Sequence, residues 1–212
     1  MTLLAHHDSS DCRSRLVQAA TEVFIEEGYR ASIERVALRA GVARQTLYNH
    51  FPSKAELFGE VIKQVTAALL VTLDGKAEGL RERLLRFGIA FRAKALSAQG
   101  LGFYRALLAE TTRFPELAAS FYRNGPAQTA ARLRAVLQEA MEHGELQPGD
   151  TEFATTTLLS MLVGAERSRY LLSGEPPPEP DPARVAQIVD CYLRAFAPQI
   201  SPTAALPQRS VP

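Results

Sequence analysis

The chain has 212 residues, of which 46% are hydrophobic and 22% charged, and its formal net charge is +1. This balance excludes a polycation that binds nucleic acid through bulk charge. The sequence has no transmembrane-length apolar run and no signal-peptide pattern, which predicts a cytoplasmic protein with no membrane partner. The two cysteines, Cys12 and Cys191, are too few for a disulfide scaffold. We expect no metal site and no cofactor.

The N-terminal segment is expected to hold a disordered arm followed by one helix. Residues 1–10 show no hydrophobic periodicity. Over residues 11–27, the apolar residues Leu16, Ala20 and Phe24 recur at four-residue spacing. This spacing predicts an amphipathic helix, which a glycine then ends.

Residues 32–58 predict two short helices joined by a tight turn. Ser32 can cap the first helix through its hydroxyl, and apolar residues then recur at spacings of three and four. Gly41 follows the last of them, where a glycine can adopt the left-handed conformation that turns a chain out of a helix. The second helix covers about residues 43–50, because Phe51 precedes a proline and avoids the helical region. This arrangement is a helix-turn-helix, whose second helix protrudes.

The outward face of the second helix carries residue types that contact base edges and phosphates in a DNA major groove. We expect base contacts from Arg44, Gln45, Thr46 and Asn49. We expect phosphate contacts from Ser32, Tyr48, His50 and Lys54. Residues 29–54 hold five basic residues against one acidic residue, Glu34, which favours a phosphate-binding face. A solvated basic surface is the alternative, and the coincidence with a helix-turn-helix argues against it.

A longer helix is expected to connect this segment to the rest of the chain. Ser53 and Glu56 have the spacing of a capping box, in which the serine hydroxyl accepts the backbone N–H three residues on. The apolar stripe then continues to about residue 73, where an Asp-Gly pair breaks it. We assign residues 11–54 to a DNA-binding domain and residues 55–79 to the connecting helix.

Every periodic stretch between residues 80 and 198 is helical, and no strand pattern competes with it. Helices are expected at about residues 80–96, 100–108, 115–122, 127–142, 151–172 and 182–196. The expected fold class is therefore all-α, with an N-terminal three-helix helix-turn-helix domain and a C-terminal helical domain over residues 80–198. The tail, residues 199–212, is expected to be disordered.

Two sequence patterns carry a resemblance to a known family. Phe24 begins F-x-E-x-G-Y, and Ser32 begins S-I-x-x-V-A-x-x-A-G-V-x-x-x-T-L-Y-x-H-F-x-S-K-x-E-L, which ends at Leu57. Over this stretch the chain resembles the DNA-binding domain of the TetR/AcrR family of bacterial transcriptional regulators. Many members have serine where this chain has Ala43, so the cap of the second short helix is either missing, at a cost of about 1 kcal/mol, or supplied otherwise. We expect the start of that helix to depend on DNA for its order.

The resemblance implies a homodimer with a regulatory body. In the family a connecting helix joins the DNA-binding head to this body, and the last two long helices pack against their twofold mates as a four-helix bundle. In this chain those helices are residues 151–172 and 182–196. One short helix contacts only a few base pairs, so a dimer on two half-sites gains specificity.

The resemblance also implies a ligand pocket between the middle helices of the body. Eleven of the sixteen Phe and Tyr residues lie after position 80. Each one alone is more typical of a core, but together with a few polar groups they are typical of a pocket for a hydrophobic or aromatic molecule. The residues expected to line it are Phe87, Phe91, Phe103, Tyr104, Leu107, Phe121, Tyr122 and Met161, with Glu166 and Arg167 as polar contacts.

These features predict a ligand-responsive homodimeric repressor that binds a palindromic operator and is released by a small hydrophobic or aromatic molecule. An alternative is a DNA-binding regulator without a ligand, whose body serves only dimerisation or partner binding. An enzyme is not expected, since the chain has no GxGxxG, P-loop, HExxH or GxSxG pattern.

Overall fold

The computed structural model describes the backbone of residues 3–75 and 78–198 and the side chains of residues 11–75 and 78–198. Within these ranges all regular secondary structure is helical, which confirms the predicted all-α class. No helix in the described part of the chain is both long and apolar enough to cross a membrane.

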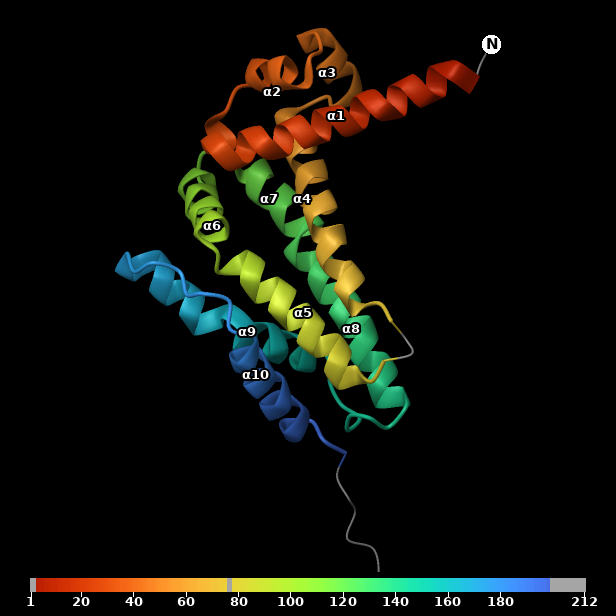
Figure 1. Ribbon diagram of the computed structural model, residues 1–212, viewed down its shortest axis with the longest axis vertical. Helices are drawn as coiled ribbons and strands as arrows, with labels where there is room; N and C mark the ends of the chain where they lie inside the picture. Colours follow the sequence, from red (N-terminus) through yellow and green to blue (C-terminus); the bar gives the residue numbers. More distant parts are fainter. Residues whose placement is uncertain (1–2, 76–77, 199–212) are drawn as a thin grey trace, which may run out of the picture.

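Three helices at one end of the molecule form the part that we call the head, and a fourth connects it to the rest (Figure 1). Their bounds are α1 (Leu3–Glu27), α2 (Ile33–Ala40), α3 (Arg44–His50) and the connecting helix α4 (Lys54–Leu70). Short 3-10 turns follow α1 and α4, at Gly28–Arg30 and Val71–Leu73. The capping predicted for α4 is present, because Ser53 Oγ accepts the backbone N–H of Glu56 at 3.1 Å.

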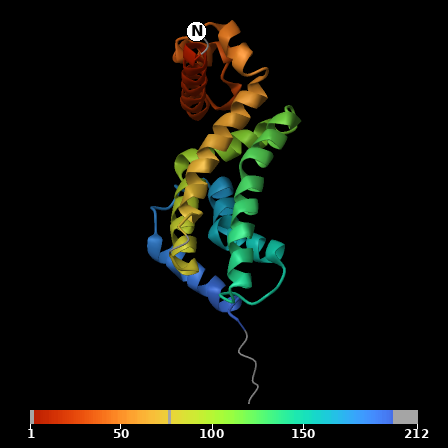
Figure 2. The same cartoon turned by 90° about the vertical axis from the view of Figure 1, so that its right-hand side faces the viewer.

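Six further helices form the body. Their bounds are α5 (Leu80–Ala95), α6 (Ala98–Glu110), α7 (Pro115–Asn124), α8 (Pro126–Glu142), α9 (Thr151–Ser173) and α10 (Pro182–Ala195). Figures 1 and 2 show α4 descending from the head beside α7 and α8, and both of these helices contact it. The connecting helix is therefore part of the body's packing as well as a link.

The N-terminus differs from the expected disordered arm. Residues 3–10 form the first turns of α1, which begins at Leu3 rather than near residue 11. No proline or glycine interrupts residues 3–27, so nothing in the local sequence ends the helix on that side. Residues 1–2 of the predicted arm and the predicted tail, residues 199–212, lie outside the described residues.

Two hydrophobic clusters hold the described helices together. One packs α1, α2 and α3 against α4, and it also includes Leu107 of α6 and Leu117 of α7. The other fills the body, where Phe87, Leu137 and Leu158 have no exposed surface. Because α6 and α7 contribute to the first cluster, the head is packed directly on the body.

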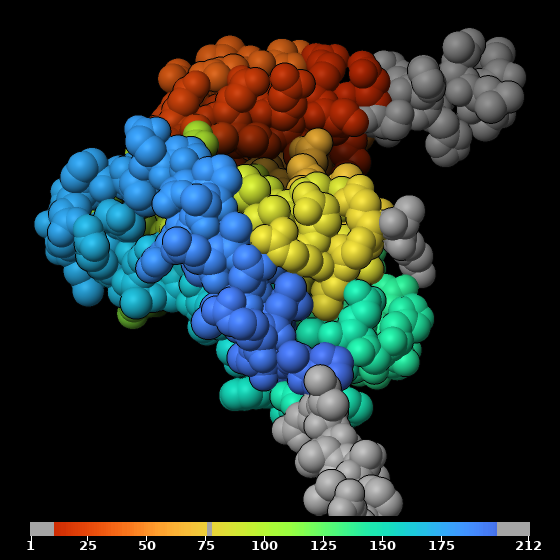
Figure 3. Space-filling view, turned by 60° about the horizontal axis from the view of Figure 1, so that its bottom comes forward, coloured from red at the N-terminus to blue at the C-terminus, as the bar shows by residue number. Residues whose placement is uncertain are grey.

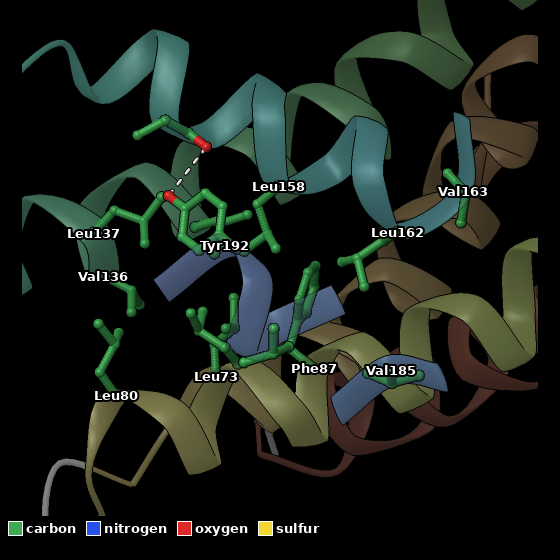
Figure 4. Close-up of a cluster of buried hydrophobic side chains, with 14 of the residues drawn as sticks. Leu73, Leu80, Phe87, Val136, Leu137, Leu158, Leu162, Val163, Val185 and Tyr192 are labelled. Atoms are coloured by element: carbon green, nitrogen blue, oxygen red, sulfur yellow. Dashed lines mark hydrogen bonds between the residues drawn. The ribbon is translucent and has the colours of Figure 1, made fainter. Parts of the chain in front are cut away.

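A buried tyrosine hydroxyl joins two helices of the body cluster (Figure 4). Tyr192 of α10 is fully buried, and its hydroxyl donates a hydrogen bond to the carbonyl oxygen of Ala154 in α9 at 3.1 Å. Burial raises the pKa of this phenol, so it stays neutral and keeps its proton for the bond. The bond fixes α10 against α9 within a largely apolar core.

Two helix crossings are so close that they need glycine. A Cβ on Gly59 of α4 would lie 2.6 Å from Ser120 Oγ in α7. A Cβ on Gly88 of α5 would lie 2.6 Å from Val185 Cγ1 in α10. Ser120 Oγ also donates to the carbonyl of Ala55 at 3.1 Å, which ties α7 to the first turn of α4. These crossings set the spacing of the helices around the sites below.

Candidate nucleic-acid interface and body cavity

The turn between α2 and α3 has the geometry that the sequence predicts. Ser32 caps α2, with its Oγ accepting the backbone N–H of Arg35 at 3.2 Å. Gly41 ends α2 in the left-handed region, with φ +67°. Leu47 is fully buried and holds α3 against the head core. The rest of α3 is therefore left to face away from the core.

Two pairs of polar side chains order the outward face of α3. Gln45 Nε2 donates to Asn49 Oδ1 at 3.1 Å. The Arg44 guanidinium lies 5.4 Å from the centre of the Tyr48 ring. Arg44, Gln45 and Asn49 are exposed, whereas Thr46, Tyr48 and His50 are half-buried. All six predicted contact residues of α3 are thus at least partly exposed, and Arg44, Gln45 and Asn49 are the most accessible to a bound molecule.

Lys54 differs from its expected outward position. Its side chain is half-buried, its ammonium donates to the carbonyl oxygen of Tyr29, and it lies 4.3 Å from the centre of the Tyr29 ring. Burial lowers the pKa of this lysine. The ammonium is engaged inside the head because the turn after α1 places Tyr29 beside the start of α4. Ser32 is exposed, and its hydroxyl donates to the nearby carboxylate of Glu34, so this bond must open before the hydroxyl can reach a phosphate.

The positive charge expected of residues 29–54 is compensated within the fold. Arg30 pairs with Glu110 at 2.6 Å and Arg44 with Glu34 at 2.6 Å. Two more arginines pair with carboxylates of α1, Arg35 with Glu27 at 2.6 Å and Arg39 with Glu22 at 3.1 Å and Glu26 at 2.8 Å. The basic excess of this segment is therefore smaller in the fold than the sequence count indicates, and phosphate binding by this face stays a prediction. Counting along the sequence included Glu34 but missed the other four acids, because α1 and α6 contribute them from outside the counted segment.

The head and the body meet at a charged and aromatic junction. Glu110 at the end of α6 is only 6% exposed at its side chain, whereas its partner Arg30 is 79% exposed. The rings of Tyr29 and Phe58 lie 5.3 Å apart, edge to face, and Phe58 stacks on Phe103 of α6 at 5.7 Å. Burial raises the pKa of the Tyr29 phenol to about 12. Through these contacts α6 touches both the head and the interior of the body.

A cavity of about 890 Å³ lies between α4 and the helices of the body. Its wall includes residues of α1, α4, α5, α6, α7, α8 and α9. Seven of the ten residues predicted as ligand contacts line it: Phe91, Phe103, Tyr104, Leu107, Phe121, Tyr122 and Arg167. The volume is within the range of small-molecule sites, which is roughly 300–1,000 Å³.

Three predicted ligand contacts lie elsewhere. Phe87 has no exposed surface and stacks on Phe91 inside the body core. Met161 is half-buried against the same core. Glu166 lies 2.6 Å from the Nη1 atom of Arg92, so its carboxylate is committed to an ion pair outside the cavity wall. Neighbouring positions on one helix face different directions, and helical periodicity alone does not say which direction meets the cavity.

The sequence prediction also missed part of the wall. The connecting helix α4 contributes Val61, Ile62, Val65, Thr66 and Leu69, and α1 contributes Thr21, Phe24 and Ile25. The signal for α4 was its apolar stripe, which is broader than the head alone requires. Lys94, near the end of α5, is a further lining residue. No local pattern distinguishes it from an ordinary surface lysine.

Comparison with known families agrees with this architecture. Residues 16–61 match the family model described as bacterial regulatory proteins, tetR family. Residues 82–198 match the model described as AefR-like transcriptional repressor, C-terminal domain. The chain belongs to the TetR family. TetR-family regulators bind DNA and dimerise, so the α2–α3 unit is a DNA-binding element and the protein is a transcriptional regulator rather than an enzyme.

Individual relatives match either most of the chain or a part of it. An uncharacterized HTH-type transcriptional regulator of Mycobacterium bovis is 28% identical over 169 residues, which are 77% of this chain and 78% of that protein. The transcriptional activator FasR of Mycolicibacterium smegmatis is 38% identical over 73 residues, which are 34% of this chain and only 30% of FasR. The similarity to FasR is therefore limited to about a third of each protein.

Solved TetR-family structures share the whole fold. A putative regulator from Mesorhizobium loti superimposes with a TM-score of 0.71 at 27% identity, covering 89% of this chain and 96% of that one. The structure called flavonoid-responsive regulator FrrA gives a TM-score of 0.68 at 29% identity, covering 90% and 99%. The arrangement of head, connecting helix and body is therefore common to these proteins.

Proposed function

We propose that this TetR-family regulator is a homodimeric repressor that binds a palindromic operator and leaves it when a hydrophobic or aromatic small molecule occupies the body cavity. The observation that carries the proposal is the cavity itself. Its wall is shared by α4, which leads to the head, and α6, whose Glu110 is paired with Arg30 of the head. A molecule in this cavity touches both connections between body and head.

The operator contacts are assigned to the exposed face of α3. Arg44, Gln45, Thr46 and Asn49 contact base edges, where arginine and amide side chains can form paired hydrogen bonds with guanine and adenine. Tyr48, His50 and Ser32 contact phosphates at the edge of this face. Lys54 is a weaker candidate, since its ammonium must first leave Tyr29. The ion pair between Arg44 and Glu34 must also open, or turn, when DNA binds.

The dimer is assigned to α9 and α10. Figure 3 shows these helices and the loop between them exposed together along one side of the body. One face of α9 is exposed or half-buried and carries, beside Phe153, short side chains that permit close helix contact: Thr156, Thr157 and Ser168. Twofold pairing through this side gives the protein two α3 helices, as a palindrome requires. Half-sites one helical turn apart are separated by roughly 34 Å.

The effector is assigned to the apolar and aromatic chemistry of the cavity wall. Phe103, Phe121 and Tyr104 supply flat surfaces, and Val65 and Leu69 supply aliphatic ones. The structural similarity to FrrA, named as flavonoid-responsive, supports an aromatic effector. The AefR-like repressor model, which covers more than half of the chain, supports repression rather than activation.

The release of DNA follows if the effector favours a different spacing of the two heads. A ligand shifts a conformational equilibrium only by its difference in affinity for the two states. Here the difference arises when the cavity walls on α4 and α6 separate to admit the ligand, which moves the head attached to both.

The DNA-binding part is tested by letting the purified protein select fragments of its own genome and sequencing them. The selected fragment then serves as the probe in fluorescence anisotropy with the variants Arg44→Ala and Tyr48→Ala. We expect inverted half-sites, and a loss of affinity of about tenfold or more for each variant. Arg123→Ala, at an exposed arginine of α7, is the matched control and should bind as the wild type does. Wild-type binding by both α3 variants would contradict the assignment.

A further inference from the structure

The wall of the body cavity contains two cations and no carboxylate. Lys94 near the end of α5 and Arg167 of α9 are the charged side chains among the described residues that line it. No described carboxylate lies within 4 Å of either charged group, although thirteen such ion pairs are present elsewhere in this part of the chain. The cavity therefore has an uncompensated positive charge.

Four carboxylates on or next to helices of the wall are paired with other arginines. Glu166, next to Arg167 in sequence, lies 2.6 Å from Arg92. Glu110 of α6 pairs with Arg30, and Glu60 of α4 pairs with Arg13 at 3.0 Å. Just after α9, Glu175 pairs with Arg169 of that helix at 2.5 Å. These four acids are therefore engaged with arginines other than Arg167.

Arg167 is held in position by an aromatic ring of the same wall. Its guanidinium carbon lies 4.7 Å from the centre of the Tyr104 ring, a cation–π contact. Tyr104 in turn meets Phe121 edge to face at 6.4 Å. The charge therefore borders an aromatic surface. On α5, Lys94 is exposed, and partial desolvation lowers the pKa of its ammonium.

We propose that the effector is an aromatic carboxylate, with its ring system against Phe103 and Phe121 and its carboxylate bound by Arg167 and Lys94. This inference rests on the proposed function of the cavity as the effector site and specifies its chemistry. A planar carboxylate can accept two parallel hydrogen bonds from a guanidinium, and charge-assisted bonds are about twice as strong as neutral ones. A neutral ligand of the same shape would cover the aromatic wall but would leave both cations without a partner.

The test compares a carboxylate with its neutral isostere on the full-length protein. N-phenyl-1-naphthylamine, a neutral dye that fluoresces in apolar cavities, reports occupancy and should bind once per chain. It is displaced in separate titrations by 2-naphthoate and by 2-naphthamide at pH 7, where the former is ionised. In the wild type we expect 2-naphthoate to displace the dye at a concentration at least about tenfold lower, the worth of one charge-assisted hydrogen bond.

The variants assign this preference to the two cations. Arg167→Gln and Lys94→Gln should each reduce the advantage of 2-naphthoate, and the double variant should abolish it while the dye binds as before. Arg167→Lys keeps the charge and should retain part of the advantage. Arg169→Gln, two residues further along α9, is the control and should behave as the wild type does, because Arg169 is exposed, does not line the cavity and is paired with Glu175.

Each remaining outcome overturns a defined statement. Equal displacement by the two compounds in the wild type would refute the carboxylate inference and leave a hydrophobic effector site in place. An advantage that survives in the double variant would refute the roles of Lys94 and Arg167. No binding of the dye or of either compound would refute the inference together with the ligand part of the proposed function, while operator binding in the anisotropy assay would still uphold its DNA-binding part.

Discussion

At the scale of single residues, Glu34 limits the charge that α3 can offer to DNA. Its Oε1 atom lies 2.6 Å from Arg44 Nη1, and both side chains are more than half exposed. The backbone N–H of Glu34 itself, at the start of α2, holds the pKa of this carboxyl below its ordinary value. The carboxylate is therefore charged at neutral pH, where it orients Arg44 but also repels phosphates.

Glu34→Gln is expected to strengthen DNA binding. It frees Arg44 and removes a negative charge from the interface, and the gain should be about two- to fivefold, the worth of one exposed ion pair. Anisotropy titrations at several salt concentrations measure it, and Glu145→Gln in an exposed loop of the body is the control. Unchanged or weaker binding by Glu34→Gln would show that orienting Arg44 matters more than freeing it.

Ala43 leaves the first turn of α3 without a side-chain cap. It occupies the N-cap position with extended backbone angles, φ −69° and ψ 148°, and no side-chain hydrogen bond caps the helix. Of the two alternatives that the sequence left open, a missing cap or one supplied otherwise, the structure shows the first. The unpaired N–H groups at the start of α3 are then available to water or to a phosphate of DNA.

Ala43→Ser should stabilise the protein by about 1 kcal/mol, because a serine at this position can accept a backbone N–H of the first turn. Chemical denaturation measures the change. Amide hydrogen exchange of residues 44–47 should slow on DNA binding in the wild type and slow less in the variant. Exchange in the wild type that is equally slow with and without DNA would count against the idea that DNA orders this turn.

At the scale of helices, the crossing of α4 and α7 depends on Gly59. Replacing it with alanine places a Cβ 2.6 Å from Ser120 Oγ and 2.9 Å from Asn124 Nδ2. We expect Gly59→Ala to lower the free energy of unfolding by about 1–3 kcal/mol, as overpacking does. Gly102→Ala in α6 meets nothing within 4 Å and should be neutral or stabilising by up to about 1 kcal/mol. Thermal unfolding of the two variants in parallel distinguishes packing from helix propensity.

The ion pair between Arg30 and Glu110 joins the head to α6. Arg30→Gln leaves the buried carboxylate without its ion-pair partner, and we expect a loss of stability of about 1–3 kcal/mol. The control is Arg35→Gln, whose partner Glu27 is 35% exposed, and its cost should stay below about 1 kcal/mol. Denaturant titrations compare the two. Equal losses of stability in the two variants would show that burial of Glu110 does not matter.

The Arg30→Gln variant also tests the coupling between effector and DNA binding. If the effector changes DNA affinity less in this variant than in the wild type, the ion pair between Arg30 and Glu110 transmits part of the coupling.

At the scale of the whole molecule, the sequence predicts best what is encoded locally. The caps at Ser32 and Ser53, the turn at Gly41 and the boundaries of the body helices follow from a few neighbouring residues. The cavity wall and the ion pairs join residues far apart in the chain, such as Arg30 with Glu110. Phe87 and Phe91 lie one turn apart with the same chemistry, yet only Phe91 lines the cavity, and the packing of other helices decides which.

The proposed dimer gives a prediction at this scale. Thr157→Arg places a long charged side chain on the face of α9 assigned to the twofold contact. We expect it to convert the wild-type dimer to a monomer in analytical ultracentrifugation and to weaken operator binding. Gln128→Arg, on the exposed surface of α8, adds the same charge outside that face and should remain dimeric. A dimeric Thr157→Arg protein would move the interface elsewhere.

The central claim is that occupancy of the body cavity and affinity for DNA are coupled. The most direct measurement is the affinity of the wild-type protein for its selected operator, by fluorescence anisotropy, with and without compounds that raise its melting temperature. We predict that such compounds weaken operator binding by about five- to 150-fold, the usual range of coupling between two sites. Stabilising compounds that displace the cavity dye and leave operator affinity unchanged would contradict the claim, and would favour a regulator whose body serves only dimerisation or partner binding.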